Sequence, residues 1–182
     1  DDTTRCALIA ADPRSGDVIK PLARGDDIRK WHIRDSQRFI IYTHGQTRID
    51  NYPAVKNYLM QYKDRLEQRA GPQPWWQLQQ AQYRDGVWDG PKLVYPDICR
   101  ESRFTLDRGK IYVDMKGFVA ATDDCYLLGI LNSRSVWWYL QQICAVLGDP
   151  GRGGRLQLKR QYLEEVPIPE ADAADRHAIT QL

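Results

Sequence analysis

The stretch YLLGILNSRSVWWYLQQ (residues 126–142), with the following GRGGRLQLKRQYLEEVPIP (151–169), decides the fold of this chain. Leu, Ile and Trp recur along the first segment at helical spacing, which predicts a long apolar helix. We expect Thr122 or Asp123 to cap its start, and Asn132–Ser133 to interrupt it, because Asn and Ser are favoured helix caps. The remaining elements are expected to pack against this segment, and VPIP is expected to end the fold.

The preceding residues alternate between β-rich segments and one clear helix. The spacing of apolar residues along 53–70 predicts an amphipathic helix, with Val55, Tyr58, Leu59, Tyr62 and Leu66 on one face. Strands are predicted at 6–11, at 38–44 (a central strand), at 92–98 (an edge or bulged strand, because of Pro96) and in a hairpin over 103–121 around Asp107–Gly109; short helices are predicted at 26–31 and 74–80. The fold class is therefore α+β, a mixed and largely antiparallel sheet with amphipathic helices packed on it.

Composition indicates an ordinary globular chain. Of the 182 residues, 42% are apolar and 27% are charged, and no apolar run approaches the length that a bilayer-spanning helix needs. The four cysteines have no metal-binding spacing, so we expect them to pack as small buried groups in a reducing, cytoplasmic setting. The first residues lack both a Met and a signal sequence, so we expect a piece of a longer protein.

The net charge of +2 hides an uneven distribution. Residues 163–182 hold five acidic residues and one Arg and contribute −4, which leaves +6 for the other 162 residues. A positively charged body favours a polyanionic partner, although an ordinary surface is also compatible with this charge. The loop at 148–159, which is rich in Gly, Arg and Lys, is the strongest local candidate.

Cationic side chains at turns and loop edges are the candidate DNA-binding residues. Long cations in loops can neutralise phosphates, and some can reach guanine edges as bidentate donors. The set is Arg24, Arg29, Arg100, Arg103, Lys110, Arg152, Arg155 and Lys159, with Gln77 or Gln79 as polar partners.

Two other functional classes stay open. Pro96–Asp97 followed by Asp114-Met115-Lys116 matches the loose signature of nucleases in which two carboxylates hold Mg²⁺ and a lysine positions the nucleophile. Three common residues at a free spacing also recur by chance. The other class is a protein-interaction module in which exposed aromatic residues bind a partner subunit. The adjacent Trp75 and Trp76 could stack on bases, but such pairs more often divide between core and surface.

Several segments in order resemble the TaqI-like C-terminal specificity domain, the target recognition domain of adenine-specific DNA methyltransferases and single-chain restriction–modification enzymes. The segments are PLARGDDIRKW (21–31), RFIIYTH (38–44), YPAVKNYLMQYKDRLEQR (52–69), PWWQL (74–78), PKLVYPDI (91–98), FTLDRGKIYV (104–113), YLLGILNSRSVWWYL (126–140) and EEVPIP (164–169). Each segment alone is modest, whereas the ordered set is fairly specific.

The resemblance implies a module that reads a short double-stranded DNA sequence. It would present this DNA to an N-terminal methyltransferase domain of the same parent chain, which binds S-adenosylmethionine and flips the target adenine. Neither the adenine-binding NPPY motif nor the cofactor Gly motif is present in this sequence. Residues 1–169 are thus expected to form a recognition domain without catalytic residues, cofactor or metal, and residues 170–182 an acidic tail in which a helix could begin. S-adenosylmethionine, with Mg²⁺ as a second candidate, is expected only in the parent.

Overall fold

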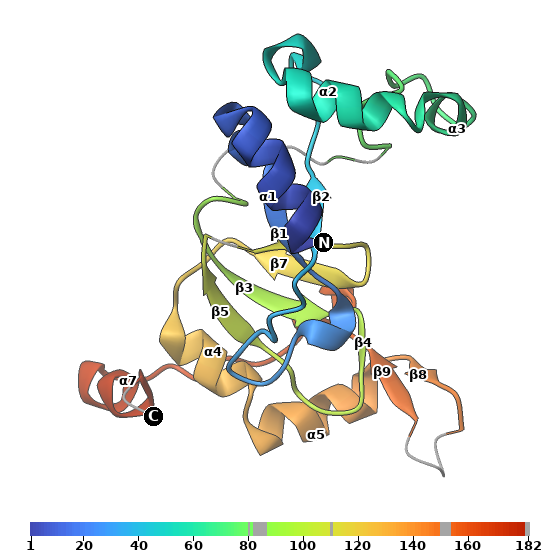
Figure 1. Ribbon diagram of the computed structural model, residues 1–182. Coiled ribbons are helices and arrows are strands. Elements are labelled where there is room, and N and C mark those ends of the chain that lie inside the picture. The colour runs from blue at the N-terminus through green and yellow to red at the C-terminus, as the bar shows by residue number, and fades with distance from the viewer. Residues whose placement is uncertain (80, 82–86, 110, 150–153, 181–182) are drawn as a thin grey trace. The chain divides into compact units, whose positions relative to one another are not determined.

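The computed structural model describes residues 1–79, 81, 87–109, 111–149 and 154–180 (Figure 1). It is an α+β fold, as the sequence predicts, with short sheets and helices instead of one large sheet. The chain divides into two compact units. Unit 1 comprises residues 1–22, 37–86 and 110–112, and unit 2 comprises residues 23–36, 87–109 and 113–182.

Unit 1 combines short helices with most of a three-stranded sheet of order β2-β1-β6. Its core contains Val18, Ile19, Ile49 and Val55. The elements are α1 (Asp2–Ala11), η1 (Pro13–Asp17), β1 (Ile19–Ala23), β2 (Phe39–Ile41), η3 (Ile49–Asn51), α2 (Pro53–Met60), α3 (Lys63–Glu67) and β6 (Tyr112–Val113).

Four predictions for unit 1 are wrong in detail. Residues 6–11 belong to helix α1, because Asp1 accepts a hydrogen bond from the Thr4 N–H and caps a helix that includes the apolar run. The helix predicted over 53–70 breaks between α2 and α3. β2 lies at a sheet edge and not at the centre. Residues 74–79 form turns instead of a helix.

Unit 2 contains two antiparallel three-stranded sheets. The first has the order β5-β3-β7 and the second has the order β4-β9-β8. The strands are β3 (Pro91–Pro96), β4 (Ile98–Cys99), β5 (Thr105–Arg108), β7 (Gly117–Ala120), β8 (Val146–Leu147) and β9 (Arg155–Gln157). The helices are η2 (Gly25–Asp27), α4 (Cys125–Leu131), α5 (Arg134–Ile143), α6 (Arg160–Leu163) and α7 (Ala173–Thr180).

The segment 126–142 is central to unit 2, although it is two helices and not one. The Asp124 carboxylate accepts hydrogen bonds from the first N–H groups of α4, one residue after the predicted cap. The break at Asn132–Ser133 is confirmed, and Ser133 Oγ accepts from the Val136 N–H at 3.1 Å as the cap of α5. Apolar residues of both helices pack with those of β3 in one core.

The hairpin predicted over residues 103–121 is also wrong. A hairpin centred on Asp107–Gly109 would pair β5 with β6, but β6 lies beside β1 in another sheet, and β5 and β7 each pair with an opposite edge of β3. β3 is therefore a central strand, and Pro96 is tolerated because it is the last residue of that strand. The turn after β5 bonds back toward β3, since Asp107 accepts from both Lys92 Nζ and the Gly109 N–H.

The two ends of unit 2 differ from their predictions in opposite ways: residues 26–31 form less helix than predicted, and the fold continues beyond VPIP into the helix expected in the acidic tail. Residues 25–27 form a single 3-10 turn, and the chain then folds into a tight turn instead of a helix over 26–31. Residues 173–180 form α7, which packs on α4, and Arg176 donates a hydrogen bond to Asp124 at 2.9 Å. None of the helices within the described ranges is long and apolar enough to cross a membrane.

Candidate nucleic-acid interface

Strand pairing between β4 and β9 brings together two candidate cations that are far apart in sequence. Cys99 is the register partner of Leu156. Arg100 directly follows Cys99, and Arg155 directly precedes Leu156, so the antiparallel ladder places both arginines at its same end. Both residues are exposed. The pairing therefore creates a local concentration of positive charge.

Lys159 lies at the other end of β9. It is exposed and precedes α6, while the intervening Leu156 and Leu158 are buried in the core. Four residues of extended chain span roughly 13 Å. The loop at 148–159, which the sequence suggested as one basic patch, is thus divided: Arg155 joins Arg100, and Lys159 lies apart from them. Arg152 and Lys110 lie outside the described residues.

A second group of cations surrounds a tight turn at residues 28–33. Ile28 and Ile33 form an isolated antiparallel bridge, and the Arg29 N–H donates to the His32 carbonyl at 2.9 Å. The pKa of Arg29 is lowered first by partial burial and then by the nearby positive charges of Arg103 and Arg34. The carboxylates of Asp26 and Asp27 act in the opposite direction, so Arg29 lies among charges of both signs, one of them from the loop that carries Arg103.

The turn is attached to the loop that carries Arg103. The Trp31 N–H donates to the Phe104 carbonyl at 3.1 Å, and Asn132 donates from Nδ2 to the same carbonyl at 2.8 Å. Phe104 is fully buried, so this attachment is part of the core. Arg103 itself pairs with Glu101 at 3.0 Å. The loop at 100–104 therefore connects the Arg100–Arg155 pair to the Arg29 turn.

Sequence reasoning found Arg29 and Arg103 but not their neighbours. Lys30, Trp31 and Arg34 belong to the same turn region, and a predicted helix there concealed their common location. The signal that could have identified the turn is Gly25 with Asp26 and Asp27, typical loop residues. Arg24, the remaining candidate, is exposed at the start of η2, apart from the hydrogen bonds that define the turn.

The residues of the nuclease alternative serve local structure. Asp97 Oδ1 accepts from Gln157 Nε2 at 3.3 Å, and Asp114 Oδ1 accepts from the Lys116 N–H at 2.9 Å. Neighbouring backbone connects the two sites, because the Asp97 N–H donates to the Lys116 carbonyl. In the part of the chain that the structure describes, no cluster of three or more His, Cys, Asp or Glu side chains could hold a metal ion.

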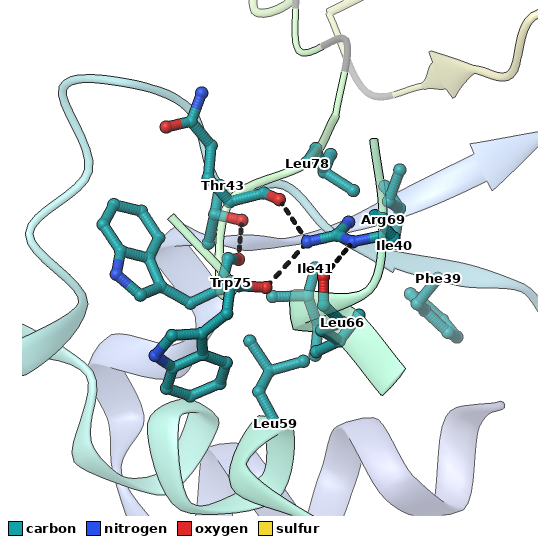
Figure 2. Close-up of a pocket in the computed structure, with 11 residues that line it drawn as sticks. Phe39, Ile40, Ile41, Thr43, Leu59, Leu66, Arg69, Trp75 and Leu78 are labelled. Atoms are coloured by element: carbon teal, nitrogen blue, oxygen red, sulfur yellow. Dashed lines mark hydrogen bonds between the residues drawn. The ribbon is translucent and has the colours of Figure 1, made fainter. Parts of the chain in front are cut away.

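An apolar cleft of about 290 Å³ lies within unit 1 (Figure 2). The Arg69 guanidinium at this cleft donates to the carbonyls of Leu66, Trp75 and Gln77, with distances of 3.0, 2.7 and 2.9 Å. Both neighbouring indoles are partly buried, and Gln79 donates to the Ala70 carbonyl. Arg69 thus fixes the loop at 70–79, and this cleft gives no evidence of base-reading groups.

Comparison with known proteins places the chain in a family. The sequence matches the model of the TaqI-like C-terminal specificity domain over residues 20–168. Type II methyltransferase M.BanIII of Aneurinibacillus aneurinilyticus is 27% identical over 177 residues, which cover 86% of this chain and 30% of that protein. Type II methyltransferase M.PaeR7I of Pseudomonas aeruginosa is 26% identical over 129 residues, covering 69% and 22% respectively.

A solved structure with the same fold is that of the Type IIL restriction-modification enzyme MmeI in complex with DNA. The TM-score is 0.64 at 11% sequence identity, and the match covers 99% of this chain and 24% of that chain. This chain spans less than a third of each of the three proteins. The structural similarity establishes the fold, and the sequence match confirms the resemblance identified from the ordered segments.

Proposed function

The chain belongs to the family of TaqI-like C-terminal specificity domains, and on this premise we propose that it recognises a specific sequence in double-stranded DNA. It would act as the recognition module of a larger restriction–modification enzyme or adenine-specific DNA methyltransferase. Residues 1–169 would form the recognition domain and 170–182 an acidic tail. The methyltransferase domain of the same parent would carry the catalytic residues.

The observation that supports this proposal most strongly is the gathering of cations within unit 2. Arg100 and Arg155 share one end of the β4–β9 ladder, and the adjoining loop leads to Arg103 and Arg29. Phosphates repeat along DNA at fixed spacing, so separate cationic loops on one unit can each neutralise a phosphate. Base readout then depends on the side chains that those contacts hold in register.

S-adenosylmethionine does not fit the cleft in unit 1. The cofactor carries a sulfonium and an ammonium group, which acidic or aromatic neighbours would stabilise. The described lining of the cleft includes the aromatic residues Phe39, Trp75 and Trp76, but it has no Asp or Glu to pair with the ammonium group, and its charged residue, Arg69, would repel both cationic groups. We therefore propose that the parent's other domain binds the cofactor.

A salt titration of DNA binding tests the proposed interface. We expect the 182-residue chain to bind a short labelled duplex at low salt, with an affinity that falls steeply as salt increases. Replacing both Arg100 and Arg155 with Gln should reduce the slope of log Kd against log salt by about 1 to 2, because each lost phosphate contact removes roughly one released counterion.

The matched control is the pair Arg65→Gln and Arg134→Gln, which removes two exposed arginines outside the interface. This control should leave the salt slope unchanged. Equal salt slopes for the Arg100/Arg155 variant and the control would show that this end of the β4–β9 ladder makes no phosphate contact. Replacing Arg152, Arg155 and Lys159 together tests the sequence-based loop as a whole.

The nuclease alternative predicts a different result. Mg²⁺ would have to produce nicking of supercoiled DNA that disappears in both Asp97→Ala and Asp114→Ala. We expect no such cleavage, since each carboxylate accepts a hydrogen bond from its own surroundings. Cleavage lost in both variants would establish a nuclease instead of a pure recognition module. A chain that binds a protein subunit but no duplex would establish the interaction-module alternative.

A further inference from the structure

Trp31 is exposed at the tip of the cationic turn in unit 2. Its exposed fraction is 54%, which is unusual for the residue type with the largest apolar side chain. The Lys30 ammonium lies 5.4 Å from the centroid of the indole ring. A flat aromatic surface is thus presented to solvent amid positive charge.

The backbone holds Trp31 in this position. Its φ angle is 73°, in the left-handed region that bulky residues seldom adopt. The Trp31 N–H is bonded to the buried Phe104, which Asn132 also binds through both its side-chain amide atoms. Unfavourable backbone angles persist only where the surrounding structure enforces them, and they concentrate at functional sites. The core therefore fixes the backbone position from which the exposed indole of Trp31 extends.

The charges around this ring indicate the kind of ligand it would meet. The Arg29 guanidinium is repelled by the charges of Arg103 and Arg34 and attracted by those of Asp26 and Asp27. A phosphate bound beside Arg29 would offset the repulsion from the other two arginines. A ligand that offers both anionic groups and flat aromatic faces satisfies the guanidinium groups and the indole together. Nucleic acid has this combination, because bases stack on aromatic side chains while phosphates bind the adjacent cations.

We propose, on the basis of the proposed DNA-recognition function, that Trp31 stacks on a base of the bound duplex while the neighbouring arginines bind the flanking phosphates. Such a contact requires local unstacking of the duplex, which aromatic and apolar wedges achieve in other DNA-binding proteins. The stacking contact releases no counterions, so the salt dependence of its contribution to binding differs from that of an arginine–phosphate contact. Stacking contributes affinity that does not depend on salt.

The test compares Trp31→Ala, Trp31→Phe and the wild-type chain on a labelled duplex with a randomised interior, at several salt concentrations. Trp31→Ala should weaken binding by about five- to a hundredfold, the range for loss of one base–aromatic stack, with the salt slope unchanged. Trp31→Phe should recover most of the affinity, because its ring can still stack. Trp138→Ala is the matched control, since Trp138 is 64% exposed on α5 and should not contact DNA.

A fluorescent base analogue placed along the duplex adds a second readout. Its emission should change on binding of the wild-type chain and respond less to Trp31→Ala. Wild-type affinity retained in Trp31→Ala, or equal losses in Trp31→Ala and Trp138→Ala, would overturn the stacking proposal while leaving DNA recognition intact. Failure of the wild-type chain to bind any duplex at low salt would overturn both. Thermal unfolding of each variant checks that its fold is intact.

Discussion

At the scale of single residues, the buried ion pair between Lys92 and Asp107 determines how β3 and β5 meet. Lys92 Nζ lies 2.6 Å from Asp107 Oδ2, and the two side chains are 0% and 7% exposed. The same ammonium donates to the Trp88 carbonyl, and the carboxylate accepts from the Gly109 N–H. Sequence patterns predicted a strand at Lys92 and a turn at Asp107, but they gave no means of pairing these two charges across fifteen residues.

Replacing Lys92 with Met should destabilise the fold by about 3–5 kcal/mol, because the Asp107 charge is then buried without its partner. The double variant Lys92→Met/Asp107→Leu should recover much of that loss, since neither charge remains. Urea unfolding measures both changes. Lys116→Met, at an exposed site, is the control and should have little effect. A Lys92→Met variant as stable as the wild type would contradict the proposed importance of the pair.

The cysteines provide a prediction about pH. Burial raises the pKa of the Cys99 thiol to about 12 and that of Cys144 to about 11, from an ordinary value of 9.0. Because the folded pKa values are raised, the neutral thiols contribute stability that is fully present below pH 9 and is lost as pH increases toward 11 to 12. Stability measured by urea unfolding should therefore fall over this window.

Replacing Cys99 and Cys144 with Ala should reduce the dependence of stability on alkaline pH. An unchanged pH profile in that variant would show that other groups cause the loss. Alkylation offers a second check, since exposed Cys6 should react in the folded chain while Cys99 and Cys144 react only after unfolding. The prediction that all four cysteines are buried holds for Cys99 and Cys144, but Cys6 on helix α1 is exposed and Cys125 is only partly buried.

At the scale of elements, the helix caps determine where the central helices of unit 2 begin. The Asn132–Ser133 signal was readable because a capping Ser accepts from an N–H group two or three residues further along the chain, so the relevant information is local. The Asp1 cap of α1 is equally local, but its following apolar run is short and fits a strand as well as a helix. Local sequence signals therefore predicted some helix boundaries, whereas they did not determine which strands pair with each other.

Replacing Ser133 with Ala should destabilise the chain by about 0.5–2 kcal/mol, because the Val136 N–H loses its acceptor at the start of α5. Ser135→Ala removes an exposed hydroxyl inside the same helix and is the matched control. Chemical denaturation of the two variants gives the comparison. Equal stability of the two variants would show that Ser133 does not cap α5.

At the scale of the whole molecule, the candidate interface depends on pairings that no single segment reveals. The α+β class and the family followed from the order of segments along the chain, which is sequence information. Arg100 and Arg155 become neighbours only through the β4–β9 register, and Arg29 approaches Arg103 only through the bond from Trp31 to Phe104. The candidate cations were thus identifiable by type, whereas their grouping required the tertiary structure.

Selection from a pool of random-sequence duplexes tests the central claim of sequence-specific recognition most directly. Base contacts discriminate between sequences, whereas phosphate contacts do not, so increasing salt during selection suppresses the non-specific contribution. We predict that the duplexes retained by the 182-residue chain converge on one short consensus, and that a change within it weakens binding more than a change outside it. A retained pool that stays random, or an absence of binding even at low salt, would contradict the account.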